Sequence, residues 1–383
     1  MRAYPPILLE QLVQEVLERN RTINCTDVYS VTNSAGFVPS TEYFNKEVFS
    51  KDISSYKVVR KGMFAYNPSR INVGSLAWLH EMETVVVSPL YIVFQIDDSK
   101  LCHQYLNLFM HSEIGNDQIR HLTTGSVRDS LKFSALKRIS IPLPPIDTQR
   151  RIAAVLDKAQ SLIAARREQI AVLDKLSKDL FIDMFGDMNT NPMKWEMKNL
   201  LAVASIDTHM TSDFEKYADC YHIGIENIEK NSGAIINPTK VKDSGLISGK
   251  YPFDSRHIIY SKIRPNLNKV ALPDFVGLCS ADSYPILPKN DVCDRIYLAF
   301  VMRSEFFLSY ILDFSGRSNI PKVNKQQLSS FNLPTPPIEL QREFAKKVTA
   351  INCQKSRLVE SLTELETLYK SLTQRAFAGE LFT

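Results

Sequence analysis

The sequence predicts an α+β protein, with two pseudo-repeated mixed α/β domains separated by two long helices that form an antiparallel coiled coil. Three observations lead to this fold class. A proline-rich motif recurs at an offset of 192 residues in a chain of 383, a heptad pattern of apolar residues follows each copy, and the segments between the helices are rich in β-branched and aromatic residues. Self-similarity at a fixed offset indicates a duplicated architecture.

The repeated motif marks the start of each helix. Its first copy runs from Pro142 as PLPPIDTQR, and its second runs from Pro334 as PTPPIELQR. A Pro-Pro pair cannot lie inside a helix, because proline lacks the N–H donor and clashes with the preceding turn. Asp147 and Glu339 follow directly, and the helix dipole favours a carboxylate in the first turn. The motif therefore predicts two helices with matching starts.

Behind each start, apolar residues recur at alternating spacings of four and three. The positions are Ile152, Leu156, Ala159, Ile163, Arg166, Ile170, Leu173, Ser177, Leu180 and Met184 in the first helix, and Phe344, Val348, Ile351, Lys355, Leu358, Leu362, Leu365, Tyr369, Leu372 and Ala376 in the second. Eight of ten are apolar in the first helix and nine of ten in the second, which indicates a coiled-coil seam. The polar exceptions fall at different heptads, and polar residues in a seam can fix register and orientation.

The two helices are long. Neither contains Pro or Gly before Gly186 and Gly379, so each runs for ~40 residues, or about 60 Å at 1.5 Å per residue. Two such helices with one register would bury each other's apolar stripe. The predicted organisation is a first domain at residues 1–141, a first spacer helix at 142–190, a second domain at 191–333 and a second spacer helix at 334–383.

The two domains share a framework while their interiors differ. Tyr105-Leu106 and Tyr297-Leu298 are one pair of anchors separated by the repeat offset, and between such anchors the identity is nearly lost. Short runs such as Val85-Val86-Val87 and His257-Ile258-Ile259-Tyr260 read as strands, because they are β-branched or aromatic and are bounded by turn residues. A duplicated scaffold with diverged inserts suits a protein that reads two different targets.

The composition is that of an ordinary soluble globular protein. Apolar residues make up 44% and charged residues 23%, and the net charge of +4 is spread thinly, so a basic surface must come from local clustering. The longest apolar run, Val85 to Phe94, is interrupted by Ser88-Pro89 and is too short to span a membrane. The N-terminus has no signal-peptide layout. Six cysteines without a CxxC pair indicate a reducing, cytoplasmic compartment and no zinc site.

The first candidate site follows a predicted strand in each half. Tyr66 and Tyr260 are each followed by Arg and then Asn at the same spacing, with an offset of 194. Arg and Asn carry the forked donors and acceptors that fit guanine and adenine edges in the DNA major groove, and Lys can bind phosphates. The candidate DNA contacts here are Lys61, Asn67, Ser69, Arg70, Asn72, Lys262, Arg264, Asn266, Asn268 and Lys269. The alternative is a solvated polar turn, since loops are polar in any protein.

The second candidate site precedes each long helix. Small hydroxyl residues, a glycine and a cation occur together there, and this combination lets the backbone approach a phosphate or a base edge closely. The candidate residues are Thr124, Ser126, Arg128, Arg317, Ser318, Asn319 and Lys322. A plain connecting loop explains the same composition, so the alternative remains open.

Motifs for catalysis are incomplete. Gly245 to Lys250 resembles a P-loop, but three residues rather than four separate the glycines, and Tyr251 stands where Ser or Thr would hold magnesium. The Pro-Pro motifs lack the acceptor and the aromatic residue of an amino-methyltransferase motif, and there is no FxGxG loop for a methyl-donor cofactor. The seven histidines show no metal-binding spacing. The sequence therefore predicts no catalytic site, no metal and no cofactor.

Together these motifs resemble those of the specificity subunits of type I restriction–modification systems. The resemblance covers the whole chain. It rests on the paired PLPPI-x-x-QR and PTPPI-x-x-QR helix starts, Met184-Phe185-Gly186-Asp187 followed by Asn191-Pro192-x-x-Trp195, Tyr260-Ser261-Lys262-Ile263-Arg264-Pro265, and Ala376-Phe377-x-Gly379-Glu380-Leu381. The first half departs from the family pattern at Asn67-Pro68-Ser69, where a Ser-Lys-hydrophobic turn is usual.

The resemblance implies a non-catalytic subunit with two target-recognition domains, each reading one half of a bipartite site in double-stranded DNA. It implies helical regions that dock methyltransferase subunits, two of them, and a restriction subunit with motor and nuclease activity as a further partner, with no membrane involved. Two other classes stay open on the residues alone: a DNA methyltransferase or nuclease fused to its reader, and a coiled-coil scaffold that binds no DNA. A steep loss of DNA binding with salt would separate a reader from such a scaffold.

Overall fold

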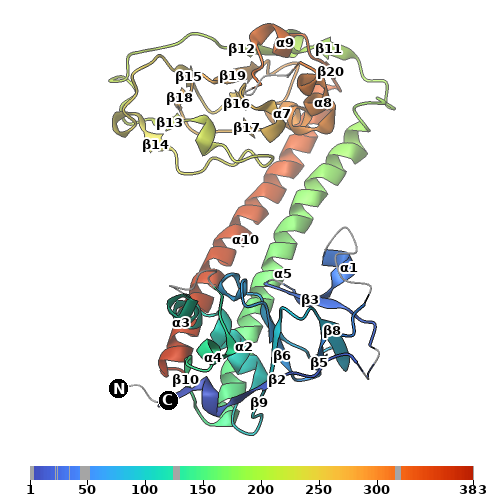
Figure 1. Cartoon of the computed structure of the whole chain (residues 1–383). Coiled ribbons are helices and arrows are strands. Elements are labelled where there is room, and N and C mark those ends of the chain that lie inside the picture. Colours follow the sequence, from blue (N-terminus) through green and yellow to red (C-terminus); the bar gives the residue numbers. More distant parts are fainter. Residues whose placement is uncertain are drawn as a thin grey trace. The chain divides into compact units, whose positions relative to one another are not determined.

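The computed structural model describes residues 4–21, 23, 25–33, 35–43, 52–123, 130–314 and 321–382. The chain divides into two compact units: unit 1 comprises Met1–Glu168 and Val359–Thr383, and unit 2 comprises Gln169–Leu358. Both unit boundaries fall inside the long helices, α5 (Ile146–Phe185) and α10 (Ile338–Ala378). Each unit therefore contains one mixed α/β region and about half of each long helix. Figure 1 shows α5 and α10 side by side.

The heptad positions explain how α5 and α10 pack. Every one of the twenty positions given by the four-three spacing is buried or half-buried. In unit 1, Gln160 Nε2 donates to Tyr369 Oη at 2.7 Å, and Arg167 forms an ion pair with Glu366 at 2.5 Å. Residue numbers rise along α5 as they fall along α10, so the two helix segments run antiparallel.

Unit 2 contains the other two helix segments in the same antiparallel arrangement. Lys355, one of the polar exceptions in the seam, forms an ion pair with Asp174 at 2.5 Å. Phe181 and Phe185 of α5 both pack edge-on against Phe344 of α10, with ring centres 5.4 Å and 5.2 Å apart. These rings belong to the main core of unit 2, so the helix seam and the domain core are continuous there.

The α/β region of unit 1 is built around a four-stranded antiparallel sheet with the strand order β2-β9-β6-β7. Three further antiparallel strand pairs are β1-β10, β3-β4 and β5-β8. The strands are β1 (Pro6–Leu8), β2 (Val13–Val16), β3 (Tyr29–Thr32), β4 (Gly36–Pro39), β5 (Lys57–Arg60), β6 (Phe64–Tyr66), β7 (Leu76–Trp78), β8 (Thr84–Val87), β9 (Ile92–Ile96) and β10 (Ser140–Pro142). The helices are η1 (Leu9–Gln11), α1 (Ser40–Tyr43), η2 (Ile71–Val73), α2 (His103–His111), α3 (Glu113–Thr123) and α4 (Phe133–Leu136).

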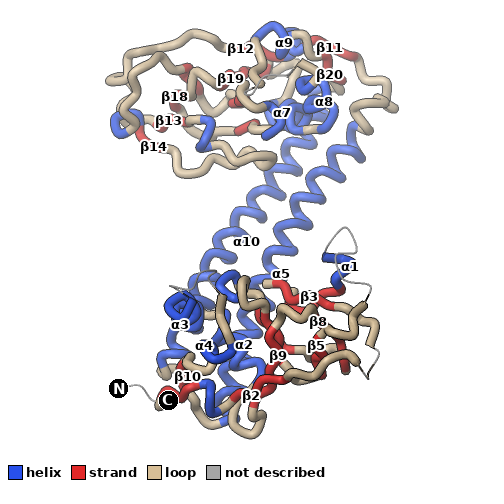
Figure 2. The backbone as a smooth tube through the Cα atoms, viewed as in Figure 1, coloured by secondary structure: helices blue, strands red, loops and turns tan. Residues whose placement is uncertain are grey.

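Unit 2 repeats this plan with the sheet order β12-β19-β16-β17, and a second sheet has the order β14-β13-β18-β15. The strands are β11 (Met197–Asn199), β12 (Ala204–Ile206), β13 (Tyr221–Ile223), β14 (Thr239–Lys240), β15 (Tyr251–Phe253), β16 (Ile258–Ser261), β17 (Val270–Ala271), β18 (Gly277–Cys279), β19 (Ser283–Pro288) and β20 (Asn332–Pro334). The helices are α6 (Leu200–Val203), η3 (Ile225–Asn227), η4 (Val241–Asp243), η5 (Pro265–Leu267), α7 (Arg295–Arg303), α8 (Glu305–Leu312) and α9 (Lys325–Ser329). Figure 2 shows long loops joining these elements.

A buried glutamine of the repeated motif ties each long helix to its domain. In unit 1, Gln149 is fully buried, and its Nε2 donates to the carbonyl oxygens of Lys100 and Pro144, both at 2.8 Å. Its Oε1 accepts from the Cys102 backbone N–H at 2.8 Å, at the start of α2. Because a buried amide must satisfy its donors and its acceptor, this side chain fixes how the α2 start meets the helix.

Unit 2 has the same joint at an offset of 192 residues. Gln341 is also fully buried, and its Nε2 donates to the carbonyl oxygens of Val292 at 3.3 Å and Pro336 at 2.7 Å. Its Oε1 accepts from the Asp294 backbone N–H at 2.9 Å, at the start of α7. The Gln of PLPPIDTQR and PTPPIELQR is therefore a structural residue, and the repeat in the sequence is a repeat of this joint.

Candidate nucleic-acid interface

In unit 2, the first predicted site lies in the turn between β16 and β17. Arg264 lies at a positive φ of 51°, just before η5, and its side chain is exposed. Asn266, within η5, is exposed as well. Among the described residues, none forms a hydrogen bond or an ion pair with either side chain. The guanidinium and the amide are therefore presented to the solvent on a short, ordered turn, and both can make paired hydrogen bonds to a base edge.

Lys262 lies between two tyrosine rings. It is only 7% exposed, and its ammonium lies 4.6 Å from the centre of the Tyr284 ring and 5.7 Å from that of Tyr251. Burial lowers the pKa of Lys262, and the nearby Lys322 lowers it further. The two rings hold the cation in place, so little side-chain freedom is left to lose when an anion binds.

Lys322 is a further cation at this turn, and an acidic residue faces it. Its Nζ lies 3.2 Å from Asp282 Oδ1, and both side chains remain well exposed. An exposed ion pair of this kind contributes little to stability, at most about 1 kcal/mol. A phosphate could therefore replace Asp282 as the partner of Lys322 at small cost.

Two other predicted contacts of unit 2 are used within the protein. Asn268 is buried, and its Nδ2 donates to the Arg303 carbonyl oxygen at 2.8 Å. Lys269 Nζ donates to the Ile225 carbonyl oxygen at 2.6 Å. Both side chains hold the turn in shape. We expected them to contact DNA because of their residue types, and the structure instead gives their donors to the backbone.

Unit 1 forms the equivalent turn between β6 and β7. Asn67 Oδ1 accepts from the Ser69 backbone N–H at 3.1 Å, so this side chain shapes the turn. Ser69, Arg70 and Asn72 are exposed, and no side-chain partner is seen for them in the described part of the chain. Arg70 and Asn72 flank the start of η2 as Arg264 and Asn266 do that of η5. The turn ends at Gly74, which has a positive φ of 90°.

Lys61 lies before β6, at the other end of that strand from the turn. Its Nζ forms an exposed ion pair with Glu83 at 2.7 Å. Because both side chains are mostly in solvent, this pair is weak and leaves the cation free to exchange partners.

Most residues of the second predicted site lie outside the described residues. These are Thr124, Ser126, Arg128, Arg317, Ser318 and Asn319. The described residues that follow them pack on the turns. In unit 1, the Leu131 N–H donates to the Pro68 carbonyl oxygen at 3.0 Å, and in unit 2 the Val323 N–H donates to that of Lys262 at 2.8 Å. In both units, the segment that leads out of the second predicted site therefore pairs with the first.

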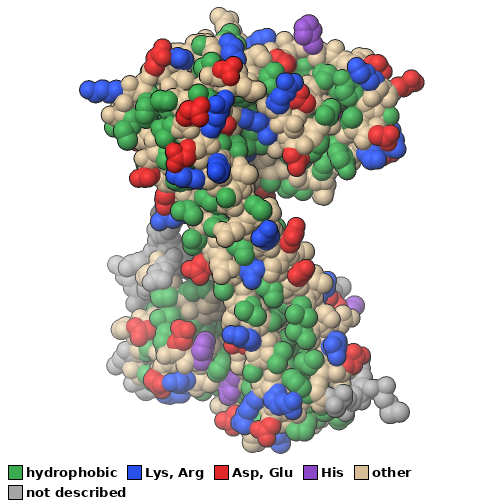
Figure 3. All heavy atoms as spheres, turned by 180° about the vertical axis from the view of Figure 1, so that it is seen from behind, with side chains coloured by type: hydrophobic (Ala, Val, Ile, Leu, Met, Phe, Trp, Pro, Cys, Tyr) green, Lys and Arg blue, Asp and Glu red, His purple; other side chains and the backbone are tan. Residues whose placement is uncertain are grey.

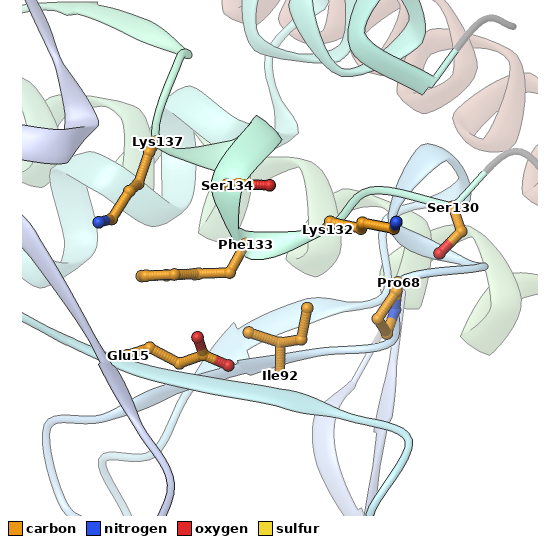
Figure 4. A pocket seen from close by; sticks show the side chains of 8 residues that line it. All are labelled: Glu15, Pro68, Ile92, Ser130, Lys132, Phe133, Ser134 and Lys137. Carbon is orange, nitrogen blue, oxygen red and sulfur yellow. The ribbon is translucent and has the colours of Figure 1, made fainter. Parts of the chain in front are cut away.

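A hollow beside the unit 1 turn holds two cations that the sequence analysis missed. Figure 4 shows Pro68 and Lys132 on one side of it, and Phe133 and Lys137 on the other. Lys132 is exposed, and the Lys137 ammonium lies 5.6 Å from the centre of the Phe133 ring. No motif marks these lysines, because they join the turn only through the pairing of Leu131 with Pro68.

The distribution of charged side chains on the surface agrees with the small net charge of +4 in the sequence. Figure 3 shows Lys and Arg side chains intermixed with Asp and Glu on the visible face of each unit. Within the described ranges, no group of three or more His, Cys, Asp or Glu residues is arranged to hold a metal ion. None of the described helices combines the length and apolar character that a membrane span needs.

Comparison with known proteins decides the family. A model of the type I restriction modification DNA specificity domain matches residues 26–174 and 192–365, one match in each half of the chain. The chain belongs to this family. It is 31% identical over 295 residues to the type I restriction enzyme EcoDI specificity subunit of Escherichia coli, covering 67% of this chain and 66% of that protein, about two thirds of its length. It is 23% identical over 341 residues to a putative MjaX specificity subunit of Methanocaldococcus jannaschii, covering 80% and 75%.

Solved structures share the fold of this specificity-family chain. The type I restriction–modification S subunit from M. genitalium gives a TM-score of 0.61 at 13% identity, covering 98% of this chain and 96% of that one. A chain from a study of complex assembly and conformational transition in a type I system gives 0.54 at 17% identity, covering 100% and 99%. These findings confirm the predicted family and fold class.

Proposed function

We propose that this chain is the non-catalytic DNA-reading subunit of a type I restriction–modification complex and that each unit reads one half of a bipartite target. One observation carries the proposal. Both halves match the DNA specificity domain, and both present an exposed Arg and an exposed Asn around the same short helix. A shared framework with different neighbouring side chains is what two different half-sites require.

The candidate residues suggest two kinds of contact with DNA. Arg70, Asn72, Arg264 and Asn266 would read base edges, because guanidinium and amide groups bond guanine and adenine in pairs. The lysines, together with Ser69, would bind phosphates, which position the protein without selecting sequence. They are Lys61, Lys132, Lys262 and Lys322.

The partners follow from the relatives. The relatives are named as specificity subunits of type I restriction enzymes, and one structural neighbour comes from a study of complex assembly. We infer that this chain binds two methyltransferase subunits and a restriction subunit, with no membrane involved, and that it acts in the cytoplasm. The repeated joints at Gln149 and Gln341 support two equivalent docking regions, since each helix start has the same local structure.

The test is a matched pair of substitutions in the full complex. Arg264→Ala should relax recognition at one half-site only, and Arg70→Ala should relax it at the other, by ~1–3 kcal/mol each if they make bidentate contacts. Arg256→Ala is the control, because Arg256 is exposed in unit 2 but already held by Asp254. The measurement is sequencing of modified bases in cells that carry the chain and its partner subunits.

Two results would contradict the proposal. If both variants weakened binding equally on every DNA sequence, these arginines would be phosphate contacts and the two units would not be separate readers. If the wild-type chain with its partners showed no salt-sensitive binding to random duplex, the scaffold class would be favoured instead. The purified chain alone should transfer no methyl group to DNA, because the sequence lacks a methyl-donor loop.

A further inference from the structure

A second turn lies beside the candidate turn in each unit, and its sequence is nearly the same in both. In unit 1, Asn33 and Ala35 lie at the tip of the β3-β4 hairpin, where the sequence reads NSAG from residue 33, and in unit 2 a second tip reads Asn231-Ser232-Gly233. The unit 2 tip lies between Ile228 and Ile235, which pair across an antiparallel bridge. Neither tip belongs to the sites that the repeats predicted.

In unit 2 the tip is bonded directly to the candidate turn. The Asn231 backbone N–H donates to the Leu267 carbonyl oxygen at 3.2 Å, and Leu267 directly follows Asn266. Gly233 has a positive φ of 69°, and any Cβ there would overlap the Val270 carbonyl oxygen and the Arg303 guanidinium. This glycine is needed because the two turns approach so closely.

In unit 1 different contacts produce the same juxtaposition. A Cβ placed on Gly74, at the end of the candidate turn, would lie 3.2 Å from Asn33 Cβ. The next residue, Ser75, donates its hydroxyl to the Val31 carbonyl oxygen at 2.7 Å. Since unrelated residues in the two units make this contact, the pairing of the two turns is a feature of the repeated framework.

The side chains at the tips are exposed and uncommitted. Asn33, Lys230 and Asn231 are exposed, and within the described residues nothing bonds their side chains. Neighbouring asparagines behave differently: Asn227 donates to the carbonyl oxygens of Ile236 and Asn237, and Asn268 donates to that of Arg303. Turn geometry explains the backbone of Asn231, which has a positive φ of 65°, but leaves its amide unused.

The tip in unit 2 also carries a lysine. Lys230 is an exposed cation next to Asn231, whose backbone bonds the candidate turn, and Glu229, the acidic residue at the tip, accepts a hydrogen bond from Ser232. Amide and guanidinium groups can read base edges, and an ammonium group can bind a phosphate.

We propose that the hairpin tips are a second reading element, in which Asn33 contacts bases of one half-site, Asn231 contacts bases of the other, and Lys230 binds a phosphate. This inference rests on the proposed function of the chain. It enlarges each reading surface from one turn to two neighbouring turns, so that neighbouring base pairs are read by different parts of the chain.

The experiment uses the complete complex and sequencing of modified bases. Asn231→Gly removes the amide but keeps a residue that accepts a positive φ. It should lower discrimination at one or more positions of one half-site about tenfold and leave the other half-site unchanged. Asn33→Ala should have the same effect on the opposite half-site. Asn237→Gly is the matched control: it is an exposed asparagine at a positive φ of 46° in the same unit, and no bond to its side chain is seen in the described structure.

Binding to duplex DNA gives a second, independent readout. Lys230→Ala should weaken binding on every sequence and reduce the salt slope by about one, because one phosphate contact is lost. An unchanged set of modified sites in Asn231→Gly and Asn33→Ala, with Arg264→Ala still changing its half-site, would overturn this inference and leave the proposed function intact. If Arg264→Ala and Arg70→Ala had no effect either, the proposed function would fail. Thermal melting of each variant would show that the fold is retained.

Discussion

The turn of unit 1 at residues 67–75 and the turn of unit 2 at residues 261–270 have the same backbone plan and different supports. In unit 2, Arg303 reaches from the end of α7 and donates through Nε and Nη2 to the Val270 carbonyl oxygen at 3.1 Å and 2.6 Å. Burial lowers the pKa of Arg303 to about 10, and no carboxylate among the described residues pairs with it. This turn is therefore held by a charged, half-buried side chain.

In unit 1 the corresponding position, 192 residues earlier, is His111 at the end of α2. Its Nε2 lies 3.2 Å from the Gly74 carbonyl oxygen, and its Nδ1 lies 2.8 Å from that of Asn107. An imidazole ring occupies here the place that a guanidinium occupies in unit 2. The comparison teaches that both units have a donor at this place but differ in its chemistry, so the side chains around each turn can differ between the two units.

The largest expected effect tests what the two units share. Gln341→Leu should destabilise unit 2 by about 3–5 kcal/mol, because it leaves the Asp294 N–H and two carbonyl oxygens without partners. Gln149→Leu should do the same to unit 1. Hydrogen exchange in urea, read separately for peptides of each unit, would measure both effects. Gln326→Leu, at an exposed position of α9, is the control. If either single variant lost protection equally in both units, the contacts of each glutamine would not act locally.

The next largest effect is expected from glycine substitutions at the two hairpin tips, which should lower stability by different amounts. Gly233→Ala should cost more than about 3 kcal/mol, because the new Cβ would overlap the Val270 carbonyl oxygen at a positive φ. Gly36→Ala should cost only about 1 kcal/mol, since at its φ of 61° the nearest atom is Ala77 Cβ at 3.5 Å. Equilibrium unfolding of both variants measures the difference. Similar costs would show that the close contact in unit 2 is relieved by a small shift.

The long helices and the fold class could be predicted from the sequence because heptads and proline caps are local signals. The roles of Gln149 and Gln341 could not, since each bonds a segment almost fifty residues away. The bonding partners of Asn268 and Lys269 could not be predicted for the same reason. Their residue types suit DNA, but their partners, Arg303 and Ile225, come from other elements of the fold.

The candidate site was predicted in part for a related reason. Arg264 and Asn266 could be proposed because the same pattern follows a tyrosine in both halves, and a repeat is visible in sequence. Tyr251 and Tyr284 were missed, since only the fold brings them to Lys262. The hairpin tips carried a readable signal, the shared Asn-Ser and nearby Gly, but their offset of 198 residues differs from that of the main repeat.

A smaller effect is expected from substituting Lys262, because the turn of unit 1 at residues 67–75 has no lysine. Lys262→Met should fill the space between the tyrosine rings and keep or raise stability, because it removes a desolvated charge. DNA affinity should fall by about tenfold or less, with a salt slope smaller by about one. Lys242→Met is the control, as Lys242 is exposed and paired with Asp219. An unchanged salt slope would show that Lys262 supports the turn only.

The same variant has a pH signature with a definite sign. The pKa of Lys262 is lowered in the folded chain, so its charge destabilises the fold at any pH below that folded-state pKa. This cost disappears as the pH rises toward the unfolded value of about 10.4. The stability advantage of Lys262→Met over the wild type should therefore shrink in alkaline solution. An advantage that grew with pH would contradict the burial of this charge.

The smallest effect is expected at the end of each turn, where the two units use different residues for one backbone shape. Asn268 has a positive φ of 47° and Gly74 a positive φ of 90°, so Asn268→Gly keeps the backbone of unit 2 and imitates unit 1. The variant loses only the bond from Asn268 Nδ2 to the Arg303 carbonyl oxygen, which should cost about 1 kcal/mol. Equilibrium unfolding measures this cost, and sequencing of modified bases should show both half-sites unchanged, because the amide is buried. A change at one half-site would mean that Asn268 holds Asn266 and its neighbours in their reading geometry, and the supports of the turn would then belong to the reading surface.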